Sequence, residues 1–449
     1  MMRKIYLAGL ALLSLNCLSA QTNPAITNWM INNSNTTGRY YTEGNSVVQT
    51  TSLVANVQTV EYSADYVYVQ SSGIPTYVMG PFLDGNPSEG SDNENIFMLP
   101  LSGEKNLGTL TETPSGAIGG FINGVPMYDY KDGQSYKSST GTDDGQGDGV
   151  WNRNAILAEK DGFDCSKGHP SPIFQGMGPQ AILVGGTYHH HQNPTAFNLD
   201  KVEVSDICDM YAADGLYTLN ASEHSPLIGY AFDGFPVYGA YGYDGEDGSG
   251  EIVLIKSSYQ ESESLVRSNG PAVSIDFPIG WYKEDYDYIA NSGHLDEHNG
   301  RFCVTPEYPD GTYAYFATVD DNWNSTYPYI VGPEYYGVVS GGNVDNISEE
   351  VTSYTTATAL STSKQLDVDI VVFPNPAADL VAIQAQGILK TNLKVKLYDL
   401  SGNLVKETII FQGSTIWHLD TQTVYDGEYI LHISDGVGTV TRKIIINKQ

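Results

Sequence analysis

The sequence predicts a mostly β protein, with a Gly- and Tyr-rich central domain of β-sheet or β-sandwich type followed by a small immunoglobulin-like β-sandwich. The first observation is composition: the 449 residues include 47 Gly, 32 Tyr and 21 Pro, and only 17% are charged, which is typical of strands and turns. The second is the alternation of apolar and polar residues between turn residues near the C-terminus. The third is a pair of repeated segments, which indicates a possible internal duplication of the central domain.

The chain begins with a predicted secretory signal peptide over residues 1–20. Arg3 and Lys4 form a charged start, Ile5–Leu15 is apolar, and Leu18–Ala20 is a suitable cleavage site. The apolar part is too short to span a membrane as a helix. No other long apolar run follows, so we expect a soluble, exported mature chain.

The mature chain is acidic, and this limits the partners we expect. The formal charge is −31 and the isoelectric point is near 4.4, with most of the acidic excess before residue 340. Such a charge is a poor match for nucleic acid or anionic membranes. It suits divalent cations, or it simply keeps the protein soluble.

Three cysteines remain after the signal peptide, namely Cys165, Cys208 and Cys303. An exported chain can form disulfides, and an odd number favours one pair and one buried thiol. Cys165 and Cys208 flank the histidine-rich segment, so we expect them to be the pair.

The composition divides the mature chain into a central domain (residues 21–340), a linker (341–366) and a C-terminal domain (367–449). Residues 21–110 are rich in Thr, Val and Tyr and predict strands that form either a separate domain or the start of the central sheet. Residues 341–366 are mostly Gly, Ser, Thr and Ala, which is typical of a linker. Turn residues such as Ser401-Gly402-Asn403 separate the alternating segments behind it, as in a β-sandwich.

The C-terminal domain resembles the type A sorting domain of the type IX secretion system of Bacteroidota. The resemblance rests on Phe373–Pro376, on the "LYDLSG" of Leu397–Gly402, on Gly427–Tyr429 and on the terminal "KIIINK". It implies that residues 367–449 are a sorting signal, which the secretion machinery recognises as the protein crosses the outer membrane. It further implies that this domain is then removed and that the rest of the protein is released or attached at the cell surface.

Two segments of the central domain repeat in the same order. Ile118–Tyr128 aligns with Ile228–Tyr238 at an offset of 110 residues, and Gly185–His191 aligns with Asp310–Phe316 at an offset of 125. Each copy predicts a turn and an alternating strand. The repeats suggest a duplicated β-unit with pseudo-twofold packing, although Gly-rich strand-turns also resemble one another by chance.

The segment "GGTYHHHQNPTAF" carries the main candidate site. If Thr187–His191 is extended, His189 and His191 share one face of the strand and His190 points to the other. Two such imidazoles can converge on one ion, and His169 and His224 are the nearest further ligands in sequence. Four imidazoles, or three and a water, suit Zn or Cu. The alternative is that the histidines are polar, hydrogen-bonded groups of a β-rich core.

Three further residues are possible additions to this site. His294 and His298 belong to "HLDEH", which formally matches a metalloprotease pattern that requires a helix. Gly293 and the Asn-Gly pair after His298 leave no room for that helix, so we favour a turn from which either histidine could still reach the site. Asp233, in "FDGFPVY", is the third.

A weaker calcium site is possible at Asp143, Asp144 and Asp148, in the Gly-rich "TDDGQGDGVW". Carboxylate oxygens suit Ca²⁺, but the spacing does not fit an EF-hand. The alternative is a flexible acidic turn.

The central region resembles the YHYH-domain family over residues 110–335. The matching motifs are "WNRNA", "GHP", "GTYHHHQNP", "HSPLIGYAFDGFPVYG", "LDEHNGRFCVTPEYPDGTYAYF" and "YPY". The family motif Tyr-His-Tyr-His is Tyr188-His189-His190-His191 here, and the changed third position leaves the His-x-His pair intact. The resemblance implies an extracellular domain whose histidine motif is suspected of binding metal.

These observations favour a secreted or cell-surface protein with a His-based metal site. The first alternative is a metal-dependent extracellular hydrolase or oxidase, in which the metal or Asp233 acts. The second is a glycan-binding or adhesion module with Tyr-rich faces and structural histidines. No P-loop, dinucleotide fingerprint or G-x-S-x-G motif is present.

Overall fold

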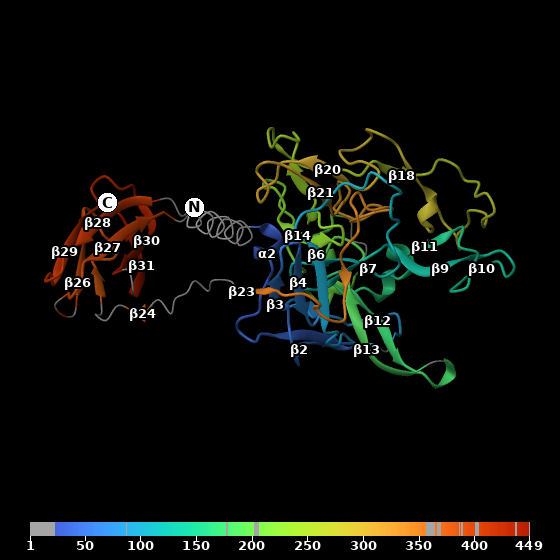
Figure 1. The fold of residues 1–449 in the computed structure, drawn as a ribbon, viewed down its shortest axis with the longest axis horizontal. Coiled ribbons are helices and arrows are strands. Elements are labelled where there is room, and N and C mark those ends of the chain that lie inside the picture. Colours follow the sequence, from blue (N-terminus) through green and yellow to red (C-terminus); the bar gives the residue numbers. More distant parts are fainter. Residues whose placement is uncertain are drawn as a thin grey trace, which may run out of the picture. The chain divides into compact units, whose positions relative to one another are not determined.

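The computed structural model describes residues 23–448, except 87, 177, 202–205, 356–363, 366–369, 386, 388, 400–403 and 436–437. The predicted signal peptide lies outside the described residues. The chain divides into a first compact unit that ends at Thr355 and a second that begins at Thr356, and nearly all its regular structure is β, as the sequence predicts (Figure 1). No described helix is long and apolar enough to cross a membrane.

A six-stranded sheet lies at the centre of the first unit, in the order β20-β21-β15-β14-β7-β8. Its strands are β7 (Ala117–Phe121), β8 (Pro126–Tyr128), β14 (Leu227–Ala231), β15 (Pro236–Tyr238), β20 (Gly300–Cys303) and β21 (Thr312–Phe316). Strands β7, β14, β15 and β21 are almost wholly buried. Both faces of this part of the sheet are therefore covered, and the sheet can hold side chains away from water.

A five-stranded sheet, in the order β22-β6-β4-β3-β23, packs on the central one. Its strands are β3 (Val57–Tyr62), β4 (Tyr66–Ser71), β6 (Asn95–Pro100), β22 (Gly342–Asn343) and β23 (Thr352–Tyr354). Buried Val and Phe side chains of β3, β4 and β6 share one apolar cluster with Tyr230, Tyr238 and Phe316 of the central sheet. The two sheets are close enough that a Cβ on Gly120 would lie 2.7 Å from the Phe97 ring. Residues 23–110 thus belong to this compact unit, to whose second layer they contribute strands β3, β4 and β6, and are not a separate domain.

A long hairpin carries the histidine-rich segment. It pairs β12 (His169–Gln175) with β13 (Ile182–His189), and its tip extends away from the rest of the unit (Figure 1). Side chains near the tip, such as Phe174 and Ile182, are exposed, whereas the base of the hairpin is buried.

Smaller elements complete the unit. The remaining strands are β1 (Thr37–Thr42), β2 (Asn45–Val54), β5 (Val78–Met79), β9 (Lys131–Lys137), β10 (Thr142–Asp144), β11 (Asn152–Asn154), β16 (Tyr241–Tyr243), β17 (Ile252–Leu254), β18 (Tyr259–Glu261) and β19 (Tyr286–Tyr288). The helices are the α-helical turns α2 (Pro24–Thr27) and α3 (Ala155–Ala158) and the 3₁₀ turns η1 (Lys160–Gly162), η2 (Gly178–Gln180), η3 (Phe197–Leu199), η4 (Ile207–Asp209) and η5 (Lys283–Asp285).

The predicted duplication is visible in the central sheet. Hairpins β7–β8 and β14–β15 pair with each other through β7 and β14, where Gly120 lies opposite its equivalent Tyr230. In the two turns, Asn123 and Asp233 each accept a hydrogen bond from the backbone N–H two residues later. The glycine that follows each of them has a positive φ, of 78° and 85°.

The second pair of repeated segments extends this equivalence to the strands next to the two hairpins. Strand β13 pairs with β12 and meets β8 in parallel at Met127–His190. Strand β21 pairs with β20 and meets β15 in parallel at Val237–Tyr315. The strand series β12-β13-β8-β7 and β20-β21-β15-β14 are therefore related by a local pseudo-twofold.

The predicted linker, residues 341–366, is in part structured. Strand β22 pairs with β6 and β23 pairs with β3, so residues up to 354 still contribute to the first unit. Small polar residues at an edge can complete a sheet through backbone hydrogen bonds alone, which composition does not reveal.

The second unit is a β-sandwich of two sheets, β24-β31-β30-β27-β28 and β25-β26-β29. Its strands are β24 (Lys364–Gln365), β25 (Ile370–Phe373), β26 (Leu380–Ala385), β27 (Leu393–Tyr398), β28 (Leu404–Ile410), β29 (Ile416–Asp420), β30 (Gly427–Ser434) and β31 (Gly438–Ile446). The buried pattern of β27 and β30 has a period of two, as the sequence predicts. The predicted turn at 401–403 lies outside the described residues.

Candidate metal centre

Three histidines meet at the base of the β12–β13 hairpin. His169 lies opposite His189 in the register of the hairpin, and His191 follows two residues later on the same face. A ligand atom from each lies within 4.8 Å of the other two, and the residues are only 7%, 1% and 4% exposed, respectively. We call His169, His189 and His191 the three-histidine group.

Two of these rings have their tautomers fixed by backbone carbonyl oxygens. His189 Nδ1 lies 2.8 Å from the carbonyl oxygen of Thr187, and His191 Nδ1 lies against that of Asp129. A carbonyl oxygen can only accept, so each Nδ1 carries the proton and donates it. In the neutral rings both Nε2 atoms then present lone pairs, and these two atoms are 2.9 Å apart.

The Glu159 carboxylate adds a third acceptor. Its Oε2 atom lies 3.1 Å from His169 Nε2 and 3.4 Å from His191 Nε2. Glu159 Oε2 and His169 Nε2 are buried and are not aligned for a hydrogen bond, and neither has another hydrogen-bond partner among the described residues. The Nε2 atoms of His189 and His191 and the Oε2 atom of Glu159 are thus three acceptors that face one another and need a proton or a cation between them.

Burial and the Glu159 carboxylate shift the pKa values of the three histidines in different directions. Burial lowers the pKa of His189 well below its usual range and that of His169 below it, with Glu159 only partly opposing the shift at His169. Burial also acts to lower the pKa of His191, but the Glu159 carboxylate, together with the backbone carbonyl and the carboxylate of Asp129, outweighs it and raises this pKa. Burial acts to raise the pKa of Glu159, but the two histidines hold it down to about 2. His189 and His169 are thus neutral near pH 7, which is the form that binds metals.

A pocket of ≈ 370 Å³ opens over the group. Tyr128 forms one wall: its ring stacks on that of His189, with centroids 3.8 Å apart. The pocket is lined by Asp84, Asn86, Ser115, Gly116, Tyr128, Lys131, Asp132, Gly133, Glu159, His169, Pro170, Ser171, Pro172, His189 and His191. A small molecule in this pocket would lie against the three-histidine group.

The loop before His169 is held by a buried carboxylate, Asp164. It accepts hydrogen bonds from the backbone N–H groups of Ser166, Gly168 and Gly80 and from the hydroxyl of Tyr188. Burial raises the pKa of Asp164 to about 7, although these hydrogen bonds oppose the shift. The carboxylate therefore orders the turn from which β12 begins.

The disulfide predicted between Cys165 and Cys208 is present in the same loop, with Cα atoms 5.2 Å apart. Cys303 is a buried free thiol, which confirms the expected pattern of one pair and one thiol. The cross-link fixes the segment that carries the three-histidine group at both sides.

The family model for YHYH proteins matches residues 96–328, which is more than half of the chain. The chain belongs to the YHYH protein family. A second model, for the secretion system C-terminal sorting domain, matches residues 371–447. No curated protein matches the chain. The sorting domain marks this YHYH protein as a secreted or cell-surface protein that interacts with the type IX secretion machinery.

The third residue of the YHYH motif, His190, serves the core. It points away from the three-histidine group, as the strand alternation predicts, and its Nε2 atom lies 2.5 Å from the Tyr77 hydroxyl. Burial lowers the pKa of His190 to about 3. This neutral ring packs between Tyr188 and Phe121.

His224, predicted as a fourth ligand, is not brought to the group. Its Nδ1 atom lies 2.7 Å from the carbonyl oxygen of Ser225, and its ring packs against Tyr238, Tyr243 and Phe316. These contacts belong to the other half of the duplicated sheet, which explains why closeness in sequence did not produce closeness in space.

The three additional candidates also lie elsewhere. Asp233 is fully buried and accepts hydrogen bonds from Tyr315 and from the backbone of Gly337. His294 accepts a hydrogen bond from the backbone of Lys256, and His298 donates one to the carbonyl oxygen of Glu334. Residues 294–298 form a turn, not a helix. None of these side chains joins the three-histidine group, the one such cluster found in the described part of the chain.

The three aspartates of the possible calcium site each contact different partners. Asp143 accepts hydrogen bonds from Trp281 and Tyr282, Asp144 pairs with Lys137, and Asp148 accepts from the backbone of Ser138. They are not gathered into a metal-binding cluster in the described part of the structure.

Sequence reasoning missed Glu159. It follows the short helix α3 in "ILAEKDG", where neither spacing nor a motif relates it to a histidine. Asp129 was missed as well, because it contributes a backbone carbonyl oxygen, which any residue can offer.

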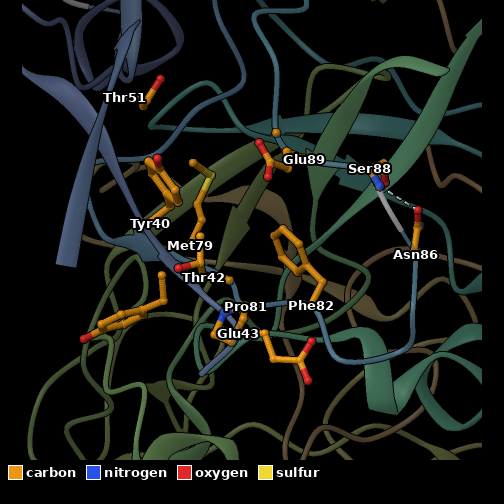
Figure 2. Close-up of a pocket in the computed structure, with 13 residues that line it drawn as sticks. Tyr40, Thr42, Glu43, Thr51, Met79, Pro81, Phe82, Asn86, Ser88 and Glu89 are labelled. Carbon is orange, nitrogen blue, oxygen red and sulfur yellow. Dashed lines mark hydrogen bonds between the residues drawn. The ribbon is translucent and has the colours of Figure 1, made fainter. Parts of the chain in front are cut away.

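A second pocket, of ≈ 350 Å³, shares Asn86 with the pocket over the histidines. Figure 2 shows Tyr40, Met79 and Phe82 around one space with the carboxylates of Glu43 and Glu89.

Proposed function

We propose that this YHYH protein binds one transition-metal ion through the Nε2 atoms of His169, His189 and His191. The observation that carries the proposal is the pair of opposed lone pairs: the Nδ1–H groups of His189 and His191 are committed to carbonyl oxygens, so their Nε2 atoms, 2.9 Å apart, have no donor between them. A cation removes that repulsion. Hydrogen bonds from the second ring nitrogen also orient histidine ligands in known metal sites.

Zinc is the metal that fits best, and copper is the second choice. Tetrahedral Zn with Zn–N bonds of about 2.0–2.1 Å separates its ligand atoms by about 3.3 Å. The separations of 2.9, 3.1 and 3.4 Å among the Nε2 atoms and Glu159 Oε2 lie close to this value. Three imidazoles and one carboxylate also suit Cu(II).

The test is elemental analysis of the purified full-length protein, with competition measurements of metal affinity. We expect one Zn or Cu per chain. His189→Ala or His191→Ala should weaken binding by more than the ~10–100-fold typical of a lost outer-shell partner. The matched control, His224→Ala, should bind as the wild type does. An unchanged affinity in His189→Ala would contradict the proposal.

An enzymatic function is the first alternative, and the ≈ 370 Å³ pocket over the site favours it. A bound divalent ion would supply a water nucleophile near neutral pH. Glu159 Oε2, next to His169 and His191, is placed to accept a proton from that water. If Glu159 is instead a fourth ligand, the site is closed and structural.

X-ray absorption of the metal-loaded wild type and Glu159→Gln separates these two roles. If the wild-type site has four protein ligands and Glu159→Gln loses one, the site is structural. A wild-type site with three histidines and a water supports hydrolysis or oxidation, which we would test with small ester substrates and with oxidisable phenols.

A glycan-binding function is the second alternative, and the pocket in Figure 2 favours it. Aromatic faces such as Tyr40 and Phe82 with nearby carboxylates can stack on and hydrogen-bond to a sugar ring. Binding on a glycan array that survives His189→Ala and is lost in Tyr40→Ala would support it. We further propose that the sorting domain is removed after export and that the YHYH unit is released or attached at the cell surface.

A further inference from the structure

The strongest feature outside the metal centre is a wholly buried lysine, Lys167. Its side chain is 0% exposed, and its Nζ atom lies 3.0 Å from Oδ1 of Asp200, whose side chain is 1% exposed. Lysine is almost never fully buried unless paired. Lys167 also has a φ of +65°, in the left-handed region that favours glycine. The fold thus holds this side chain in place at a local cost.

The surroundings do not solvate two charges. The Phe197 ring lies under Nζ at 5.3 Å, and Asp200 Oδ2 is buried with no hydrogen-bond partner among the described residues. A buried ion pair is stable only when further hydrogen bonds satisfy the remaining atoms. Burial raises the pKa of Asp200 to about 6, although Lys167 opposes the shift and the Asp320 carboxylate adds to it.

We propose that Lys167 and Asp200 react with each other to form an intramolecular amide cross-link. One proton first moves along the hydrogen bond from Nζ to Oδ1, which turns the ion pair into a neutral amine and a neutral carboxylic acid. Nζ then attacks Cγ of Asp200: the N–C bond forms, the bond from Cγ to the hydroxyl oxygen breaks, and the hydroxyl takes the second proton from nitrogen and leaves as water. No oxidant or cofactor is needed. The product replaces two buried charges by one neutral amide.

The cross-link would enclose the metal centre. The segment between Lys167 and Asp200 contains all three histidines, and the disulfide between Cys165 and Cys208 encloses the same segment one step further out. The proposal does not depend on metal binding.

The test is mass spectrometry of the full-length protein after reduction and tryptic digestion. Without a cross-link, trypsin cuts after Lys160, Lys167 and Lys201 and yields the separate peptides 161–167 and 168–201. With the cross-link, Lys167 is no longer a cleavage site. We then expect a single peptide, 161–201, lighter by one water molecule, with no backbone fragment ions between residues 167 and 200.

The controls separate the amide from other products. Loss of water at the Asp161-Gly162 step would leave cleavage after Lys167 intact. The exposed pair Lys256–Asp321 has the same 3.0 Å separation with side chains 50% and 78% exposed, and we expect normal cleavage after Lys256. Lys167→Arg, which keeps the charge, should yield the two unmodified peptides. Recovery of peptides 161–167 and 168–201 at unmodified mass from the wild type would overturn the proposal.

Discussion

The metal-free centre should release one proton when it binds a metal near neutral pH. The facing atoms of His189, His191 and Glu159 are all acceptors, so one proton can lie among them, and the raised pKa of His191 places it on that ring. The lowered pKa values of His169 and His189 keep both rings neutral, so neither ring has to lose a proton to bind the metal. Only one ligand must therefore lose a proton to bind the metal.

The direction and the size of the pH dependence of metal affinity follow from this single competing proton. Below the pKa of His191, which lies above the usual histidine value, metal must displace the proton, so affinity should fall about tenfold for each pH unit. Above that pKa the affinity should level off. Only this one proton competes with the metal. A plot of the logarithm of metal affinity against pH should therefore keep a slope near one as the pH falls, until the lowered pKa values of His169 and then His189 are reached.

Calorimetric titration with Zn²⁺ in buffers of different ionisation enthalpy measures the number of released protons. We expect about one below the pKa of His191, and fewer in Glu159→Gln, because loss of the carboxylate removes the main cause of the raised pKa. Release of two or three protons near pH 7 would show that His169 or His189 is also protonated in the metal-free protein and would refute the reasoning. Release of none in the wild type, with strong binding, would show that the ion binds elsewhere.

Two further predictions concern stability. In the Lys167→Arg background, which cannot form the amide, replacing both Cys165 and Cys208 by Ala should lower the free energy of unfolding by about 4 kcal/mol in the chain-entropy account. The estimate uses the separation of 43 residues, and urea denaturation of the oxidised protein measures it. Gly124→Ala should destabilise by about 1–3 kcal/mol more than Gly44→Ala: both have φ near +77°, but only at Gly124 would a Cβ meet another atom, Ser71 Cβ at 2.4 Å. Equal losses in the two glycine variants would contradict the clash.

The sequence predicted what depends on local periodicity. The alternation of strand side chains placed His189 and His191 on one face and His190 on the other, and the structure confirms both. The disulfide and the strand content followed from composition and spacing. Glu159 could not be predicted, because it reaches His169 and His191 only through the tertiary packing of the segment after helix α3, and no local pattern encodes that contact.

His224 shows the opposite failure, in which a local signal was misleading. Its "HSP" context resembles the "GHP" of His169, and each stands at or just before the start of a strand. In the pseudo-twofold arrangement, however, it packs on Phe316, with ring centroids 6.4 Å apart, and Phe316 is the counterpart of His191. A duplicated sheet thus brings similar sequence to two different places.

The duplication also provides an internal control for the histidines. In the second half of the sheet, Ala314 and Phe316 stand at the positions of His189 and His191, and Arg301, which pairs with Ala314, stands at that of His169. That half forms the same hairpin and the same parallel contact without a histidine at any of the three positions. The backbone arrangement therefore does not need imidazoles there. The first half instead buries three of them, two with their Nε2 lone pairs opposed, which makes a purely structural role the weaker explanation and a bound cation the stronger one.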